Sequence, residues 1–156
     1  MNTIPVQIKF RNESYRELTA YQSAGAAAFD LRANITETLT IQPGDCVLVD
    51  SGLSVFIDNP AYAGFILPRS GLGHKEGVVL GNGTGLIDSD YQGQLMISVF
   101  NRSKAPIVFE PDARIAQYYI APVMRAEFVE VPVDAPFVSE FDSERGENGF
   151  GSTGKQ

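Results

Sequence analysis

Short segments rich in β-branched and aromatic residues run along most of this chain, and turn residues separate them. Such segments favour β-strands, because branched and aromatic side chains pack well on a pleated surface. They cover residues 6–10, 38–41, 46–49, 53–57, 64–67, 94–100, 107–109, 115–120 and 126–131. Turn residues lie between them at 42–45, 58–60 and 110–112. This pattern predicts an all-β fold, a sandwich or a jelly-roll-like β-barrel.

Helix signals are few. We expect one short helix after residues 69–73, with Ser70 as its cap. The alanine run at 24–28 favours helix by propensity, but its glycine and the following residues 29–31 indicate a turn that leads into a strand.

The end of the chain differs from the rest. From about Pro136 the apolar periodicity is lost, which is typical of a segment without a packed core. We therefore predict one β-domain over residues 1–135 and a flexible C-terminal arm over residues 136–156, an arm that can pack on a neighbouring subunit.

The composition of the chain limits its possible partners and its location in the cell. The chain has 156 residues and a formal net charge of −7, and an acidic protein repels the phosphate backbone of a nucleic-acid polymer. Cys46 is the only cysteine, so no intrachain disulfide can form, as expected for the cytoplasm. The N-terminus has no signal-peptide pattern, and no apolar run reaches membrane-spanning length. We expect a cytoplasmic protein without nucleic-acid or membrane partners.

The glycine-rich tail at residues 145–154 carries groups that suit a nucleotide. It combines one cation, one aromatic ring, backbone amides and two hydroxyls: Arg145, Phe150, Gly151, Ser152 and Thr153. We interpret it as a flap that orders over a flat base and a polyphosphate. Residues 149–155 also match most of a P-loop pattern, but no helix can follow them and no Ser or Thr follows Lys155. A P-loop NTPase is therefore rejected.

Two internal segments could bind the rest of a nucleotide. Arg69 and Ser70 lie where a predicted strand ends, and a guanidinium can bind two phosphate oxygens; a capped turn with a surface arginine fits that segment equally well. Residues 77–91 read as a β-hairpin with three glycines at its tip, whose backbone could recognise a pyrimidine edge. An ordinary glycine-rich hairpin is the other interpretation.

Two aspartates follow that hairpin. Asp88 and Asp90 are both candidates to accept a proton from water, and period-2 alternation would place them on one face if the strand continued, so sequence alone does not choose between them.

Other polar residues are open to more than one interpretation. Asp30 suits either a metal or phosphate site or a strand edge. In a regular strand, Arg114 and Gln117 would point to opposite faces. His74 is the only histidine, which excludes a multi-histidine metal site.

Taken together, the segments resemble the homotrimeric dUTPase family over nearly the whole chain. The family's five segments occur in order, at residues 28–33, 68–73, 81–91, 114–117 and 145–154. One departure is Ala28, where the family usually has glycine. The resemblance implies a jelly-roll-like fold, a homotrimer with shared sites, and Mg²⁺-assisted hydrolysis of dUTP to dUMP and pyrophosphate.

The resemblance also implies roles for individual residues. Asp88, rather than Asp90, would activate the water that attacks the α-phosphorus, and Asp30 would orient Mg²⁺ through water. Tyr91 would pack on the deoxyribose and Asn82 would contact uracil. The remaining substrate-binding positions, including those of the tail on another subunit, would be Arg69, Ser70, Gly71, Gln117, Arg145, Phe150, Gly151, Ser152 and Thr153.

Two other functions compete with this one. A dCTP deaminase has a similar fold, but Asp88 and Tyr91 suit water attack on phosphorus. A non-catalytic nucleotide-binding regulatory trimer is the alternative from another class, and a binding assay without turnover would support it.

Overall fold

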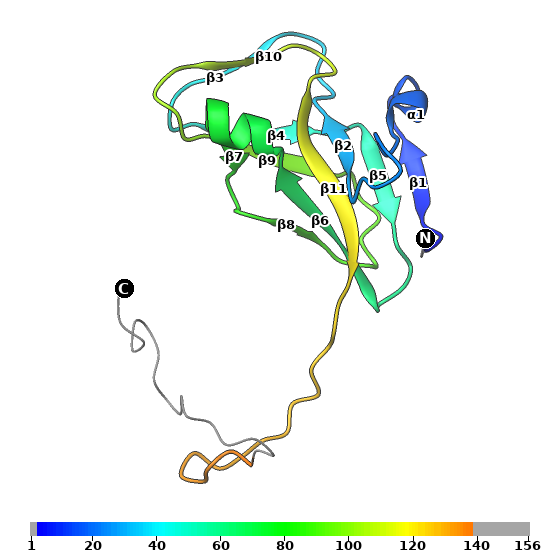
Figure 1. Cartoon of the computed structure of the whole chain (residues 1–156), viewed down its shortest axis with the longest axis vertical. Helices are drawn as coiled ribbons and strands as arrows, with labels where there is room; N and C mark the ends of the chain where they lie inside the picture. Colours follow the sequence, from blue (N-terminus) through cyan, green and yellow to red (C-terminus); the bar gives the residue numbers. More distant parts are fainter. Residues whose placement is uncertain (1–2, 139–156) are drawn as a thin grey trace. The chain divides into compact units, whose positions relative to one another are not determined.

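The computed structural model describes residues 3–138 of the chain. Its elements run in the order β1 (Gln7–Phe10), α1 (Tyr15–Leu18), β2 (Phe29–Arg32), β3 (Leu39–Ile41), β4 (Cys46–Asp50), β5 (Leu53–Phe56), β6 (Tyr62–Pro68), η1 (Leu72–Glu76), β7 (Val78–Leu80), β8 (Gly85–Ile87), β9 (Met96–Asn101), β10 (Ile107–Phe109) and β11 (Arg114–Pro122). The prediction of an all-β, jelly-roll-like fold is confirmed (Figure 1).

Two antiparallel sheets form the body of the first compact unit, which ends at Met124. The larger sheet has the order β2-β11-β6-β8, and the second has the order β4-β9-β7. Two-stranded pairs, β1-β5 and β10-β3, accompany them. Burial alternates along β9, where Ile97, Val99 and Asn101 are buried and their neighbours are partly exposed. This alternation is the period of a strand with one face on a core.

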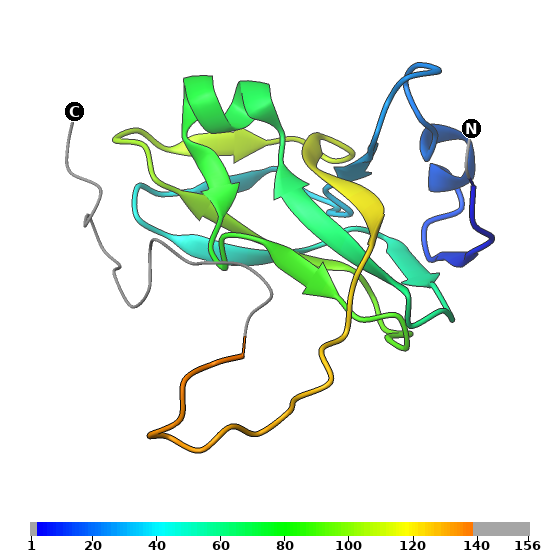
Figure 2. The same cartoon turned by 60° about the horizontal axis from the view of Figure 1, so that its bottom comes forward.

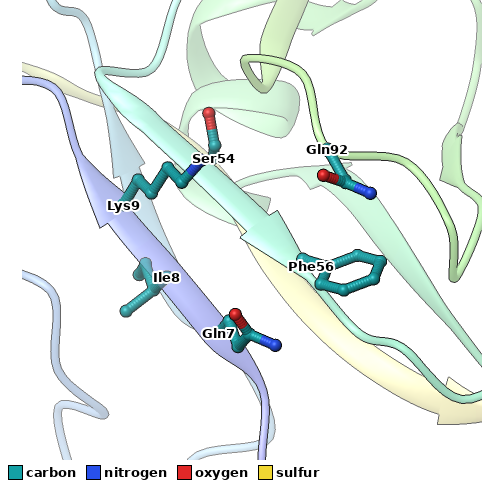
Figure 3. A pocket seen from close by; sticks show the side chains of 6 residues that line it. All are labelled: Gln7, Ile8, Lys9, Ser54, Phe56 and Gln92. Atoms are coloured by element: carbon teal, nitrogen blue, oxygen red, sulfur yellow. The ribbon is translucent and has the colours of Figure 1, made fainter.

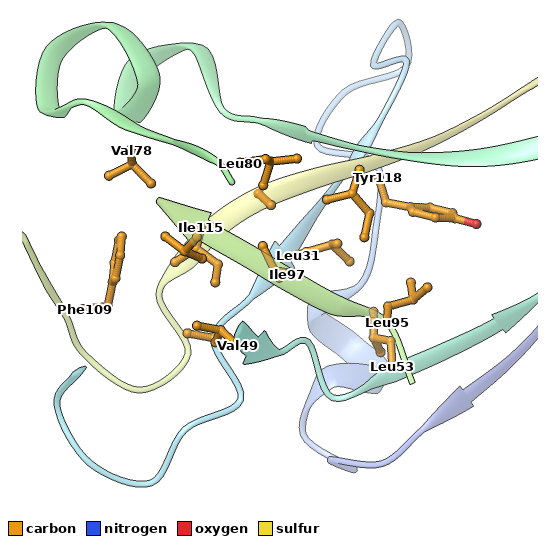
Figure 4. Packing of buried hydrophobic residues seen from close by; sticks show 14 of the residues in the cluster. Leu31, Val49, Leu53, Val78, Leu80, Leu95, Ile97, Phe109, Ile115 and Tyr118 are labelled. Carbon is orange, nitrogen blue, oxygen red and sulfur yellow. The ribbon is translucent and has the colours of Figure 1, made fainter. Parts of the chain in front are cut away.

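The core lies between the two larger sheets (Figure 4). Leu31, Ile66 and Tyr118 come from the first sheet, and Val49 and Ile97 come from the second. Each of these side chains is at most 2% exposed. Their burial supplies the main stabilising term, because apolar surface leaves water when the sheets pack.

The helix expected after residues 69–73 is present as η1, which leads from β6 to β7 (Figure 2). Its cap differs from the prediction: Gly71, not Ser70, precedes the helix, and no side-chain hydrogen bond caps it. At its other end Gly77 has a φ of 75°, and its N–H donates to the carbonyl of Leu72. Glycine suits that position because it adopts positive φ without a steric penalty. The short helix α1 was not predicted from the sequence.

One predicted strand and one predicted hairpin were wrong. Residues 126–131 form no strand, and Phe128 and Val129 are 94% and 82% exposed. A strand needs a hydrogen-bonding neighbour, and none of the strand pairs among the described residues includes this segment. Residues 77–91 are not a hairpin, because β7 pairs with β9 whereas β8 pairs with β6. The glycine loop therefore connects two sheets.

A second unit begins at Arg125. Its described residues contain no helix or strand, and the N–H of Ala135 donates to the carbonyl of Pro132 in a turn. The predicted division into residues 1–135 and 136–156 stays a prediction. Within the described part of the chain, the helices are too short to cross a lipid bilayer.

Candidate active site

Two predicted site residues, Asp30 and Arg69, form a charged centre with Arg114 on the larger sheet. Asp30 lies on β2, Arg114 begins β11, and Arg69 follows β6. The Nε of Arg69 donates to Oδ1 of Asp30 at 2.9 Å, and Nη1 of Arg114 donates to Oδ2 at 3.1 Å. The Asp30 side chain is 12% exposed, so this carboxylate is largely withdrawn from water between two cations. Such charge-assisted bonds are stronger than bonds between neutral groups.

A β-bulge brings Arg114 into this centre. Gln117 pairs with Asp30 and Ala116 with Leu31, but Arg114 pairs with Arg32, so the register shifts by one residue at Ile115. Directly paired residues share a face of the sheet, and the shift places Arg114 and Gln117 on the face of Asp30. The expectation of opposite faces was made for a regular strand, and this strand is not regular between Arg114 and Ala116.

Gln117 supports the neighbouring strand. Its Nε2 donates to the carbonyl of Pro68 at 2.9 Å. Pro68 is the last residue of β6, immediately before Arg69 and Ser70. Gln117 therefore fixes the position from which the predicted phosphate-binding segment, including Gly71, leaves the sheet. Ser70 and Gly71 are exposed and start the turn into η1.

The turn before β11 contains residues that the sequence did not single out. Asp112 has a φ of 64°, a conformation that is uncommon for a residue with a side chain. The hydroxyl of Tyr15 donates to Oδ1 of Asp112 at 2.7 Å, and Nη1 of Arg32 donates to its carbonyl at 2.8 Å. Burial, and next the bond to Asp112, hold the pKa of Tyr15 above its ordinary value. The turn signal at 110–112 was visible, but its partner lies 97 residues away.

The glycine loop between β7 and β8 starts at Gly81, which packs closely against Cys46 and Ser98. A side chain at Gly81 would overlap the Sγ of Cys46 and would come within 2.7 Å of the Oγ of Ser98. The N–H of Gly81 donates to the carbonyl of Ser98 at 2.9 Å. Asn82 follows and is exposed, and its carbonyl accepts from the N–H of Thr84 at 2.8 Å.

Asp88 and Tyr91 follow β8 as a turn. The N–H of Tyr91 donates to the carbonyl of Asp88 at 3.2 Å. Both side chains are exposed, as is that of Asp90. The strand ends at Ile87, so strand alternation does not relate Asp88 to Asp90.

The predicted residues of this unit fall into two groups, one around Asp30 and Arg69 and the other on the glycine loop and the turn after β8. Ile87, just before Asp88, pairs with Gly64, whereas Arg69 lies beyond the opposite end of β6. From Gly64 to Arg69 the strand advances roughly 16 Å, at about 3.3 Å per residue. One chain therefore does not bring Asp88 next to the charged centre of Asp30, Arg69 and Arg114.

The tail residues, the cavity and possible metal-ligand groups remain to be placed. Arg145, Phe150, Gly151, Ser152 and Thr153 lie outside the described residues. A cavity of about 200 Å³ is lined by Gln7, Ile8, Lys9, Ser54, Phe56 and Gln92, and none of the predicted site residues lines it (Figure 3). Residues 3–138 contain no group of three or more His, Cys, Asp or Glu side chains that could hold a metal ion.

The described part of the chain is thus an all-β protein whose larger sheet carries an aspartate that is bound by two arginines. A family model described as dUTPase matches residues 14–154. The deoxyuridine 5'-triphosphate nucleotidohydrolase of Alcanivorax borkumensis is 55% identical over 139 residues, which cover 89% of each chain. That of Herminiimonas arsenicoxydans is 51% identical and covers 99% of each.

A solved dUTPase structure is also similar to this chain. The G164S mutant of the dUTPase of Staphylococcus bacteriophage 80alpha with dUpNHpp is 26% identical, with a TM-score of 0.81, and the match covers 98% of this chain and 100% of that chain. The chain belongs to the dUTPase family.

Proposed function

We propose that this dUTP diphosphatase hydrolyses dUTP to dUMP and pyrophosphate by attack of water on the α-phosphorus, with Asp88 as the general base. The observation that carries the proposal is that Asp88 follows directly after β8, is exposed, and forms no ion pair with another residue in the described part of the chain. A new bond forms between the water oxygen and the α-phosphorus. The bond from that phosphorus to the bridging oxygen breaks, pyrophosphate leaves, and the water's proton passes to Asp88.

We assign the phosphates to Arg69, Ser70 and Gly71. Arg69 uses its Nε on Asp30 and its Nη1 on the carbonyl of Arg114, which orients the guanidinium. A guanidinium carries five donors in a fixed plane, so donors remain for phosphate oxygens. Ser70 and Gly71 are exposed beside it.

We assign the base and the sugar to the group on the glycine loop and the turn after β8. Asn82 contacts uracil from the exposed glycine loop, and Tyr91 packs on the deoxyribose, where it leaves no room for a 2′-hydroxyl. Gln117, which belongs to the group around Asp30, supports the uracil-binding loop. The Tyr91 side chain is 41% exposed while its hydroxyl donates to the carbonyl of Gln94 at 2.8 Å. That bond directs the hydroxyl toward the backbone of Gln94 and leaves part of the ring exposed for contact with the sugar.

The tail completes the site in this proposal. Arg145 binds the distal phosphate, Phe150 covers uracil, and Gly151, Ser152 and Thr153 contact the phosphates from another subunit. Closure of such a segment excludes bulk water and aligns the attacking molecule.

Mg²⁺ is the proposed cofactor. When bound, it offsets negative charge on the triphosphate and on the leaving pyrophosphate. Asp30 fits an indirect role, because each of its oxygens accepts one arginine bond and a carboxylate offers about four acceptor positions in all. Mg²⁺ usually keeps several waters, which suits contact through water.

We propose a homotrimer with shared sites, working in the cytoplasm. The separation of Asp88 from the Asp30 centre supports shared sites, since another copy can supply the missing group. An apolar face also supports assembly: Leu86, Phe65 and Tyr119 are cross-strand neighbours on the outer face of the larger sheet. Leu86 is 60% exposed, and the rings of Phe65 and Tyr119 stack at 5.1 Å.

One product assay tests the proposal. The purified protein is incubated separately with dUTP, dCTP, dTTP, dATP, dGTP and UTP, with Mg²⁺ and then with excess EDTA. We expect dUTP alone to give dUMP and pyrophosphate, and we expect EDTA to abolish the reaction. Deamination of dCTP would instead show the related deaminase activity, and nucleotide binding without turnover would show a regulatory protein.

A further inference from the structure

The ring of Tyr91 rests on a glycine that the backbone conformation does not require. Gly93 is not among the glycines with positive φ, so an ordinary residue could adopt its conformation. A Cβ atom at Gly93 would nevertheless overlap the hydroxyl oxygen of Tyr91 and would lie 2.9 Å from its Cε2. The position of the tyrosine ring is therefore what excludes a side chain at residue 93.

The same ring is tethered at its far end. The Tyr91 hydroxyl donates to the backbone carbonyl of Gln94 at 2.8 Å. Packing on Gly93 and this hydrogen bond restrain the ring at two points, although the side chain is 41% exposed. An exposed ring held in this way is preorganised, because it loses little freedom when a ligand packs on it.

Gln94 is itself anchored to the second sheet. Its Nε2 donates to Oδ2 of Asp50, the last residue of β4, at 2.6 Å. Asp50 also accepts from Nδ2 of Asn34 at 2.8 Å and from the N–H of Gly52 at 2.7 Å. The next residue, Leu95, is fully buried, and its N–H donates to the carbonyl of Leu53 at 2.8 Å. The carbonyl that holds Tyr91 is thus fixed to the core.

We propose that Gly93 and Gln94, held by Asp50, are specificity-determining residues: they fix the Tyr91 ring where it discriminates deoxyribose from ribose. This inference rests on the proposed sugar-packing role of Tyr91. A ring displaced by even a small distance would admit a 2′-hydroxyl and would also pack less well on deoxyribose. The ratio of kcat/KM for dUTP to that for UTP should therefore fall, whichever of the two constants changes more.

The test measures that ratio for Gly93→Ala, with Gly25→Ala as the matched control. A Cβ at Gly25 meets nothing within 4 Å, and its φ is not positive, so the same chemical change there should leave the ratio unchanged. We expect Gly93→Ala to lower the ratio roughly tenfold to a hundredfold, the range by which a pocket distinguishes substrates that differ in one small group. Thermal unfolding of each variant shows whether it is folded.

Gln94→Met provides a second variant that does not crowd the ring. It keeps the backbone carbonyl and removes the side-chain bond to Asp50, so we expect a smaller fall in the ratio. If the folded Gly93→Ala or Gln94→Met variant loses activity equally toward dUTP and UTP, the inference is wrong and the two residues serve only folding or turnover. Tyr91→Ala separates the two proposals: if it keeps the wild-type ratio, the sugar-packing role of Tyr91 itself is wrong.

Discussion

Arg114 and Asp30 meet across two paired strands although 84 residues separate them in the chain, with Nη1 of the arginine 3.1 Å from Oδ2 of the aspartate. Arg69 bonds the other oxygen, and its Nη1 reaches the carbonyl of Arg114 at 3.3 Å. The three residues therefore orient one another, and substitution of one should alter the side-chain positions of the other two.

Removal of Arg114 should weaken catalysis more than folding. We expect Arg114→Ala to lower kcat/KM for dUTP by roughly tenfold or more, because Asp30 and Arg69 lose the neighbour that orients them and a small misplacement of binding groups is costly in rate. Arg16→Ala is the control, because Arg16 pairs with Glu13 on the surface, where their side chains are 63% and 77% exposed. Equal steady-state kinetics for the two variants would show that Arg114 is not part of the site.

The proposed general base can be tested by a substitution that removes charge but keeps shape. We expect Asp88→Asn to bind a non-hydrolysable dUTP analogue with nearly unchanged affinity and to lose most turnover, by roughly a hundredfold or more. Asp90→Asn, two residues away and also exposed, should retain turnover. Single-turnover kinetics measures the chemical step directly. If Asp90→Asn shows the larger loss, the base is Asp90.

Truncation tests the tail, which lies outside the described residues. A chain that ends before Arg145 should keep the melting temperature of the full chain, because the described core lies within the unit that ends at Met124. We expect its turnover of dUTP to fall severely, since the proposed contacts from Arg145 and Phe150 are lost. Full activity in the truncated chain would contradict the proposed flap.

Assembly should depend on the outer face of the larger sheet. Leu86→Glu places a charge beside Phe65 and Tyr119, and burial of an unpaired charge is costly, so we expect smaller assemblies and loss of activity. Val108→Glu is the control, because Val108 is 55% exposed on β10, outside that sheet. Light scattering after size exclusion measures the molecular mass. A wild-type mass for Leu86→Glu would show that this face is not the interface.

A buried hydroxyl should make stability depend on alkaline pH. Tyr118 is fully buried, and its hydroxyl has no hydrogen-bond partner in the described part of the chain. Burial raises the pKa of Tyr118 to about 12, from an ordinary value of 10.0. The native state thus keeps a proton that the unfolded chain releases, so this group's contribution is complete below pH 10 and is lost as the pH rises toward 12.

Tyr118→Phe should flatten that alkaline loss and leave the free energy of unfolding at neutral pH unchanged or higher by about 1 kcal/mol, because no buried hydroxyl remains unsatisfied. Urea unfolding at pH 8 and at pH 10.5 measures both effects. A clear loss of stability at pH 8 would mean that the hydroxyl has a favourable partner.

The fold class and most strand positions could be predicted from the sequence, because β-branched residues, strand periodicity and turn residues report local backbone preferences. It also identified the segments that contain Asp30, Arg69, Asn82, Asp88 and Gln117. It misjudged residues 126–131, whose composition suits a strand that has no partner among the described residues.

The pairing of the strands, and hence which side chains meet, became visible only in the folded chain. Local patterns could not show that β7 and β8 join different sheets, or that a bulge at Ile115 turns Arg114 toward Asp30. A shift of one residue moves a side chain to the other face of a sheet, and contacts between distant segments fix that shift. The anchoring of Asp112 by Tyr15 and of Gln94 by Asp50 depends on such contacts too, across 97 and 44 residues.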